Sequence, residues 1–499
     1  MKIQRGLAVA VSILIIFAAL ARGAHDLWSA TAVYFAVLVL SLAILFLSVR
    51  AEGEPLRLPM AVPAVLVAAA LGISFAQAAN PADAFLGLMD GLCALLLFLV
   101  AANVFISEKP VDHFLLFLLP CLWIEFGVVI WQISAITERE KMGTLVNGNL
   151  LCAFALPWAL VFAGRVMEDW KKDRSHALAW ASGAAAALGC LAFAQSSAAV
   201  IALLAGAALL SLRYRESALL RPLFRRWPWF AAAIAAAVVW VVADKFTRVY
   251  DPVLYPNRDT SNRFYWWKSA ALMFRDHPWF GVGPGNFPAA YLAYKVGGKE
   301  NTLFVHSAPL TWLAETGMVG FAAIASFFAA WIARARTGWR TGTVRLEFLP
   351  AVSAMVIFTS VSIGLEYQVN LMVLMVLMAL TVAPVETFQV KPRPSVFIVA
   401  LVGVLAAVPY VVSPFLASRS TVDGEAALQK KDLAGAEKSF FNAIRIDPRA
   451  WEPYAGLARV AFEKGDDAVA EEFQAKALER NRLSLPLKRQ MEIYRRRRR

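Results

Sequence analysis

The stretch Thr31–Ser48 reads TAVYFAVLVLSLAILFLS and contains no charged residue. As a helix it is close to the ~20 residues that cross the hydrocarbon core of a bilayer. Similar runs recur along the chain, which is 59% hydrophobic and only 17% charged. Soluble domains are roughly 45–50% apolar and about 25% charged. The sequence therefore predicts an all-α, polytopic membrane protein, and it excludes soluble, disordered and disulfide-scaffold classes.

Thirteen apolar runs are candidate spans, which predicts about 12–13 transmembrane helices. The run 178–212 divides least clearly, because only the short polar segment Gln195–Ser197 separates its halves. The runs lie at 7–21, 31–48, 60–76, 86–106, 114–131, 149–164, 178–194, 198–212, 228–243, 310–333, 348–365, 371–385 and 395–412.

The basic residues predict the orientation of these spans. With the N-terminus inside, the inside loops hold 20 Lys and Arg, and the short outside loops hold three, Arg22, Arg139 and Lys141. This asymmetry follows the positive-inside rule. The net charge of +13 is therefore mainly a topology signal, and we expect no nucleic-acid partner.

Two polar regions remain, and the odd number of spans places both outside. The first is the loop 244–309, within a transmembrane domain predicted to cover 1–412. The second is 413–499, a predicted helical domain. All four cysteines lie in apolar runs, so we expect neither a disulfide nor a cysteine metal site.

The region 413–499 carries a repeat of 34 residues. Ala436 and Ala470 are 34 residues apart, and so are Ala443 and Ala477. This spacing resembles the tetratricopeptide pattern. The segment is interpreted either as a docking surface for a protein partner or as a helical cap without one. The run Arg495–Arg499 is typical of a solvated, disordered tail, and near a membrane it could bind lipid phosphate.

The outer loop is rich in aromatic residues, with 13 in the 63 residues of 247–309. An interfacial aromatic belt explains part of this excess. Flat rings with polar edges also suit sugar faces, and arginine forks suit phosphates. The loop therefore favours a ligand such as a polar lipid or a lipid-linked glycan.

Several features cluster where the tenth span begins. The string Phe280–Phe287, FGVGPGNF, predicts a tight turn, because its spacing is not that of a nucleotide-binding loop. His306 should lie just above the membrane, since Pro309 suits the first turn of a helix. Glu315 falls inside the span, where an acid must be paired or face a cavity. Gly317 and Gly320 are interpreted as a helix-packing face.

These residues resemble a known family. One string is similar to the signature of bacterial O-antigen ligases: it consists of His306-Ser307, then nine residues, and then Gly317–Gly320. A second set of residues resembles the outer-loop block that O-antigen ligases and polymerases share. It comprises Asn262 through Trp267, His277-Pro278 and Gly281–Phe287.

A third stretch, Met142–Asn149, is similar to a motif that precedes the sixth span of this family. A further family arginine follows a serine near the eighth span, where this chain has Ser196-Ser197-Ala198. That arginine is missing, so either another base such as Lys141, Arg139 or Arg248 replaces it, or the carrier diphosphate is handled differently.

The resemblance implies a glycosyltransferase with a fold of the GT-C type, working without a metal or other cofactor. Its donor would be a glycan on undecaprenyl diphosphate, and its acceptor a hydroxyl of a glycan or of lipid A-core. The family's catalytic arginine and histidine match Arg263 and His306. The resemblance implies a bacterial inner-membrane protein in contact with membrane lipids. With the orientation predicted from the basic residues, its N-terminus is cytoplasmic, and its active site and C-terminal domain are in the periplasm. Candidate substrate-binding residues are Arg248, Arg258, Trp266, Trp267, Lys141, Asn147 and Glu315.

The chemistry is consistent with these residues. A neutral histidine can take a proton from a weakly nucleophilic sugar hydroxyl, and arginine can stabilise a departing diphosphate. The leading hypothesis is an O-antigen ligase of lipopolysaccharide biosynthesis. Alternatives are a repeat-unit polymerase or a protein O-oligosaccharyltransferase of the same superfamily, a lipid-linked sugar transporter or flippase, and a non-catalytic scaffold.

Overall fold

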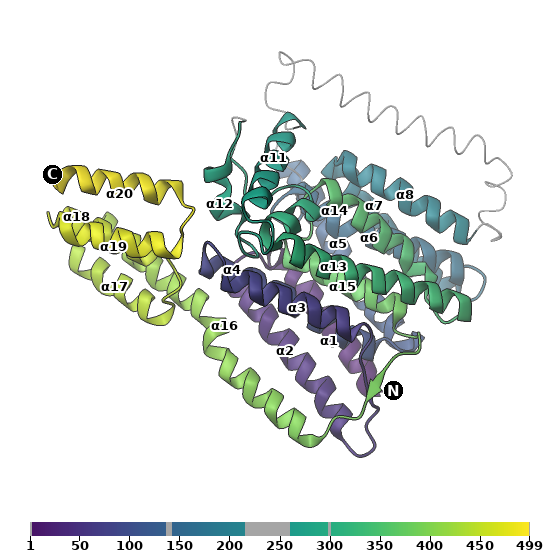
Figure 1. Ribbon diagram of the computed structural model, residues 1–499. Helices are drawn as coiled ribbons and strands as arrows, with labels where there is room; N and C mark the ends of the chain where they lie inside the picture. The colour runs from purple at the N-terminus through teal and green to yellow at the C-terminus, as the bar shows by residue number, and fades with distance from the viewer. Residues whose placement is uncertain (1, 136–141, 215–259, 298–300, 499) are drawn as a thin grey trace, which may run out of the picture.

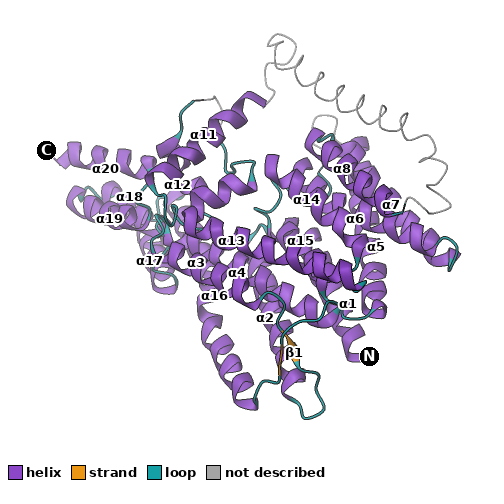
Figure 2. Cartoon of the chain, turned by 45° about the vertical axis from the view of Figure 1, so that its right-hand side comes forward, coloured by secondary structure: helices purple, strands orange, loops and turns teal. Residues whose placement is uncertain are grey.

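The computed structural model of the 499-residue chain describes residues 2–135, 142–214, 260–297 and 301–498. Over these residues the fold is almost entirely helical (Figures 1 and 2). The two short strands described, β1 (Leu56–Arg57) and β2 (Gln389–Val390), form one antiparallel ladder. This ladder ties together two connections that the sequence analysis places on the inner side of the membrane.

Eight helices in the described residues are long and apolar enough to cross a membrane. The protein is therefore a multi-pass helical membrane protein, which confirms the predicted fold class. These helices are α1 (Lys2–Leu20), α2 (Leu27–Val49), α4 (Pro81–Val104), α5 (Glu108–Ala135), α6 (Gly148–Asp169), α7 (Arg174–Ala194), α13 (Ala308–Thr341) and α16 (Pro394–Gln429).

Four shorter apolar helices coincide with further candidate spans. They are α3 (Ala61–Ala76), α8 (Ser197–Arg213), α14 (Leu349–Val361) and α15 (Gln368–Val382). Twelve of the thirteen expected runs thus form helices, and the run 228–243 lies outside the described residues. The total number of spans and their orientation stay predictions.

Helix α6 is the centre of the bundle. Within its most apolar window 83% of the residues are buried, against 6% for α16. Helix α6 packs against α7, α8 and α14, whereas α16 lies along α2 at the edge (Figure 1). Because α6 is covered by protein all round, its small and aromatic side chains form the core, including Trp158.

The remaining helices lie toward one end of the bundle. Helices α11 (Thr260–Asp276) and α12 (Phe287–Tyr294) lie over the first turns of α13 (Figure 1). At the C-terminal side, α16 runs without interruption past residue 413, the predicted domain boundary. It continues into α17 (Leu433–Ile446), α18 (Glu452–Glu463), α19 (Asp467–Arg480) and α20 (Leu485–Arg498).

The C-terminal helices pack in sequence order, and the small residues of the 34-residue spacing are buried between them. Ala436, Ala443, Ala470 and Ala477 are all fully buried. Whether this packing makes a tetratricopeptide domain stays a prediction.

The arginine run at the end of the chain forms part of helix α20 up to Arg498. Arg495 and Arg498 each pair with Glu471 at 2.8 Å, and Arg497 lies 3.5 Å from Asp467. The interpretation of this run as a disordered tail is therefore wrong for Arg495–Arg498. The acidic side chains of α19 hold these arginines against the helix before them.

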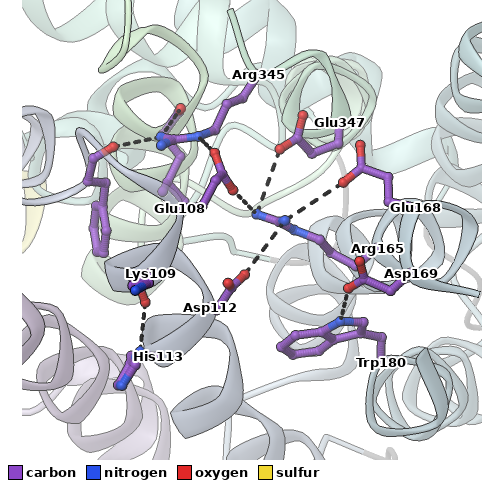
Figure 3. Close-up of polar contacts among 12 residues, drawn as sticks. Glu108, Lys109, Asp112, His113, Arg165, Glu168, Asp169, Trp180, Arg345 and Glu347 are labelled. Atoms are coloured by element: carbon purple, nitrogen blue, oxygen red, sulfur yellow. Dashed lines mark hydrogen bonds and ion pairs between the residues drawn. The ribbon is translucent and has the colours of Figure 1, made fainter. Parts of the chain in front are cut away.

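A buried arginine joins α5, α6 and the connection from α13 to α14 (Figure 3). Arg165, near the end of α6, lies 3.1 Å from Glu108, 3.6 Å from Asp112, 3.7 Å from Glu168 and 3.7 Å from Glu347. Its side chain is only 7% exposed. A charge so well buried is stable only when it is paired, so these carboxylates keep the end of α6 in place.

Arg345 extends the same cluster. Its Nε donates to Glu108 at 2.6 Å, and its Nη1 donates to the carbonyl of Phe105 at 2.6 Å. Nη1 also lies 3.3 Å from the carbonyl of Leu380, and Nη2 donates to that of Ile106 at 3.2 Å. Arg345 therefore satisfies carbonyls at the C-terminal ends of α4 and α15, and Glu108 bridges both arginines.

Replacing Arg165 by methionine should destabilise the fold by about 2 kcal/mol, because Glu347 and Glu168 lose their cation. The value is below that of a fully buried pair, since Glu108 and Asp112 are about half exposed. Thermal unfolding in detergent measures the effect. Arg336→Met, at an exposed position of α13, is the control, and equal midpoints for the two variants would contradict a structural role for the cluster.

Candidate functional site

The site is built on a break in α13. Gly317 has φ 64° and ψ −166° within this helix, a backbone conformation that residues other than glycine rarely adopt. The break leaves backbone amides of α13 without partners in their own helix, and carbonyls of the segment before α12 accept hydrogen bonds from them. Met318 N donates to Pro278 O at 2.7 Å, and Val319 N donates to Trp279 O at 3.1 Å.

A side chain at Gly317 would collide with this segment, since a Cβ there would lie 2.4 Å from the carbonyl carbon of Trp279. At Gly320 a Cβ would meet the side chain of Thr316, in its own helix, at 2.2 Å. The interpretation of the two glycines as a helix-packing face is therefore wrong for Gly317, and for Gly320 it stays a prediction. Gly317 instead admits a loop into the helix.

The loop itself is the tight turn that the sequence predicts. Gly281, Gly283 and Gly285 all have positive φ, at 69°, 112° and 73°. Val282 N donates to Ala314 O at 3.0 Å, and Gly283 N donates to Glu315 O at 2.9 Å. The loop and α13 thus exchange hydrogen bonds in both directions around the break.

The carboxylate of Glu315 anchors the same loop. Its Oε2 accepts from Gly285 N at 2.9 Å, and its Oε1 accepts from Phe287 N at 3.0 Å, at the start of α12. The hydroxyl of Ser74 lies 2.7 Å from Phe280 O and 2.9 Å from Glu315 O. Glu315 was predicted to bind substrate, and the structure gives it a structural task. Substrate contact by Glu315 stays a prediction.

His306 lies directly before α13, where Pro309 occupies the first turn as expected. Its ring stacks on Trp266 of α11, with centroids 4.6 Å apart and planes 24° from parallel. The residue is 9% exposed and has φ 61°. Burial, and then the charge of Arg263, lower the pKa of His306 to about 3. The imidazole is therefore neutral at physiological pH.

Arg263 stands on α11 one turn before Trp266. Its Nη1 donates to Val361 O at 2.9 Å, at the end of α14. Helix α11 therefore brings Arg263 and Trp266 close to His306, and the catalytic roles of Arg263 and His306 stay predictions. The ring of Trp267 packs edge-on against Phe264, with centroids 5.5 Å apart.

The remaining predicted residues lie elsewhere or are not described. Asn147 caps α6, and its side chain accepts from Leu150 N at 3.0 Å. Near it, the hydroxyl of Ser196 donates to Asn149 at 3.0 Å, at the place where the family arginine is missing. Lys141, Arg139, Arg248 and Arg258 lie outside the described residues.

A cavity of about 270 Å³ lies beside the loop and the first turns of α13. Its walls come mainly from apolar residues of α3, α4, α13 and α15, and from Leu303, Phe304 and Val305. Three carboxylic acids line it: Asp90, Glu315 and Glu366. Sequence reasoning missed Glu366. The signal was an acid placed between the apolar runs 348–365 and 371–385.

The C-terminal helices reach the same region. Arg482 N donates to Ala79 O at 3.1 Å, and its Nη2 donates to Ala78 O at 2.7 Å. Ala79 N in turn donates to Val282 O at 2.9 Å, within the glycine-rich loop. Leu483 packs against the cluster that contains Trp266. The connection from α3 to α4 therefore lies between the C-terminal helices and the site.

No group of three or more histidine, cysteine, aspartate or glutamate side chains in the described residues is arranged to hold a metal ion. The cysteines described, Cys93, Cys121, Cys152 and Cys190, are buried and unpaired with one another.

Residues 182–325 match the model of a protein family described as O-antigen ligase. The match spans α11, His306 and the break in α13. A comparison with curated proteins finds no match. The segment that holds the candidate site is therefore similar to this family.

Acidification should weaken the fold through His306. Between the ordinary pKa of 6.5 and the lowered value of about 3, the unfolded chain binds a proton that the folded protein does not. Stability is thus lost as the pH falls below 6.5, by on the order of 2 kcal/mol at pH 5. The thermal midpoint in detergent should therefore fall more between pH 7 and pH 5 in the native protein than in His306→Gln. His113→Gln, on α5, is the matched control, and an equal fall in all three proteins would contradict the burial of a neutral His306.

Removing the side chain of Arg482 should loosen the connection between α3 and α4. Arg482→Ala leaves the carbonyls of Gln77 and Ala78 without their donor. We expect faster hydrogen exchange at Ala79 and Val282, measured by mass spectrometry, whereas Arg489→Ala, at an exposed position of α20, should change neither. Unchanged exchange in Arg482→Ala would show that the C-terminal helices do not stabilise the loop.

Proposed function

We propose that this protein transfers a glycan from an undecaprenyl diphosphate carrier to an acceptor hydroxyl at the outer face of the bacterial inner membrane. The observation that carries the proposal is that Arg263 on α11 and His306, directly before α13, lie close together inside the segment that matches the O-antigen ligase family.

In this proposal the guanidinium of Arg263 binds the diphosphate of the donor. Transfer breaks the bond between the anomeric carbon and the diphosphate oxygen, and that oxygen keeps the electron pair. Arginine stabilises the developing negative charge because its fork can donate to two oxygens at once. The proximity of its charge to His306, which lowers the pKa of the imidazole, supports a cationic centre at this point.

His306 contributes as a neutral imidazole. Its ring is fixed by stacking on Trp266, so it can present a nitrogen to a substrate oxygen without losing further side-chain entropy. Aromatic rings of α11, Trp266 and Trp267 among them, suit the apolar faces of sugars. Attack on the side opposite the departing diphosphate inverts the anomeric centre.

The acceptor decides between the members of this class. Attachment to lipid A-core makes the protein an O-antigen ligase, the leading proposal. Attachment to a second lipid-linked glycan makes it a polymerase, and attachment to a polypeptide makes it a protein O-oligosaccharyltransferase. Reconstitution with a radiolabelled lipid-linked oligosaccharide and each acceptor distinguishes them. Release of carrier diphosphate indicates a transferase, and passage of uncleaved donor across the bilayer indicates a transporter.

The assignment of Arg263 is tested by two substitutions. Arg263→Ala should lower kcat/KM by roughly 10²–10³-fold, the cost of losing one stabilising group for a developing charge. Arg263→Lys should stay impaired by more than about tenfold, because an ammonium cannot grip two phosphate oxygens. His306→Ala should also abolish most transfer.

Arg275→Lys is the matched control, since Arg275 is an exposed arginine on the same helix, paired with Asp276. Transfer rate and lipid-diphosphate affinity are measured for each variant. Near-native values in both Arg263 variants would contradict the assignment, and would direct attention to Arg248 or Arg258.

A further inference from the structure

Glu366 is the acid of the cavity whose task the fold does not explain. It lies in the short connection between α14 and α15 and faces a cavity of about 270 Å³ with largely apolar walls. A carboxylate in such surroundings is costly unless its oxygens are hydrogen-bonded. The three acids that line the cavity differ in how well this condition is met.

Two of the three acids already have partners. Both oxygens of Glu315 accept backbone amides, those of Gly285 and Phe287. One oxygen of Asp90 accepts the hydroxyl of Tyr34 at 2.8 Å, and its other oxygen is not among the described atoms that are buried without a partner. The fold therefore uses these two carboxyl groups to hold the loop and to join α2 to α4.

Glu366 is only half satisfied. Its Oε2 accepts from Gly364 N at 2.7 Å, but its Oε1 is buried without a hydrogen-bond partner in the described part of the chain. Burial raises the pKa of this carboxyl group, and the hydroxyl of Thr311 beside it opposes that rise. That hydroxyl donates its single proton to Ser307 O at 2.9 Å. One carboxyl oxygen of a side chain that lines the cavity is thus left without a hydrogen-bond partner among the described residues.

We propose that Glu366 binds the acceptor hydroxyl and takes its proton during glycan transfer. This inference rests on the proposed function. The proton moves from the acceptor hydroxyl to Oε1 of Glu366, and the acceptor oxygen forms a bond to the anomeric carbon of the donor. The bond from that carbon to the diphosphate breaks, and the diphosphate leaves with the electron pair.

The connection that carries Glu366 also contacts the donor side of the site. Arg263 donates to Val361 O, five residues before Glu366. Val305 and Ala308, which flank His306 and Ser307 in the sequence, line the same cavity. An acceptor in the cavity would therefore lie next to the arginine and histidine that are proposed to hold the donor.

The electrostatics favour Glu366 over His306 as the proton acceptor. Burial raises the pKa of Glu366, and a base is more effective as its pKa approaches the working pH. His306, with a pKa of about 3, is a weaker base at that pH. Glu315 and Tyr367 interact electrostatically with Glu366, and Asp90 lines the same cavity.

Isosteric replacement tests the proposal. Glu366→Gln should lower kcat by roughly 10²–10⁴-fold, the usual contribution of a general base. The affinity for the lipid-diphosphate donor, measured without acceptor, should stay within about twofold, because the change removes no donor contact. Glu366→Asp should recover part of the rate, since it restores a carboxylate. Glu52→Gln is the control, because it removes an exposed acid from the connection between α2 and α3. This variant should behave like the native protein.

The pH dependence separates a base from a structural acid. In the native protein kcat/KM should fall toward low pH as Glu366 becomes protonated, and the residual activity of Glu366→Gln should lack this decline. Thermal midpoints confirm that each variant is folded. A Glu366→Gln rate within about threefold of the native rate, or an unchanged acidic decline, would overturn the inference. If the native protein releases no carrier diphosphate with any acceptor, the proposed function itself fails.

Discussion

The break in α13 at Gly317 is the constraint on which the site depends. Hydrocarbon offers no hydrogen-bond partners, so an interrupted helix at membrane depth must find them within the protein. The carbonyls of Pro278 and Trp279 supply them. Once this loop is fixed, Glu315 can cap α12, and α11 lies where Trp266 meets His306. A single glycine thus permits the segment before α12 to be seated on α13.

Much of the fold follows from local sequence, because each apolar run must be helical to enter a bilayer. The turn at Gly281–Gly285 and the helix start at Pro309 follow from the same kind of local chemistry. Glu366 and the contact of Arg482 with Ala78 do not. Both depend on residues brought together from distant parts of the chain, and neither leaves a periodic pattern. The role of Gly317 was misread for this reason, since its neighbour is a loop and not a helix.

Burial shifts the pKa values of His306 and Glu366 in opposite directions. It disfavours the charged form of each, so it lowers the pKa of His306 and raises that of Glu366. Both groups are consequently biased toward neutrality before substrate arrives. In the proposed mechanism Arg263 is the cation that meets a ligand with two phosphates. The walls of the cavity and the ring of Trp266 provide the low dielectric that makes this charge effective.

The hydrogen bond between Arg482 and Ala78 joins residues 404 positions apart. During synthesis the connection between α3 and α4 is made early, and it must wait for some four hundred further residues before its partner leaves the ribosome. The spans between them can be inserted in the meantime, but the glycine-rich loop lacks this support until the C-terminal helices have folded. An unfinished chain can therefore form the hydrogen bonds between the loop and α13, but not yet the outer support that Arg482 adds.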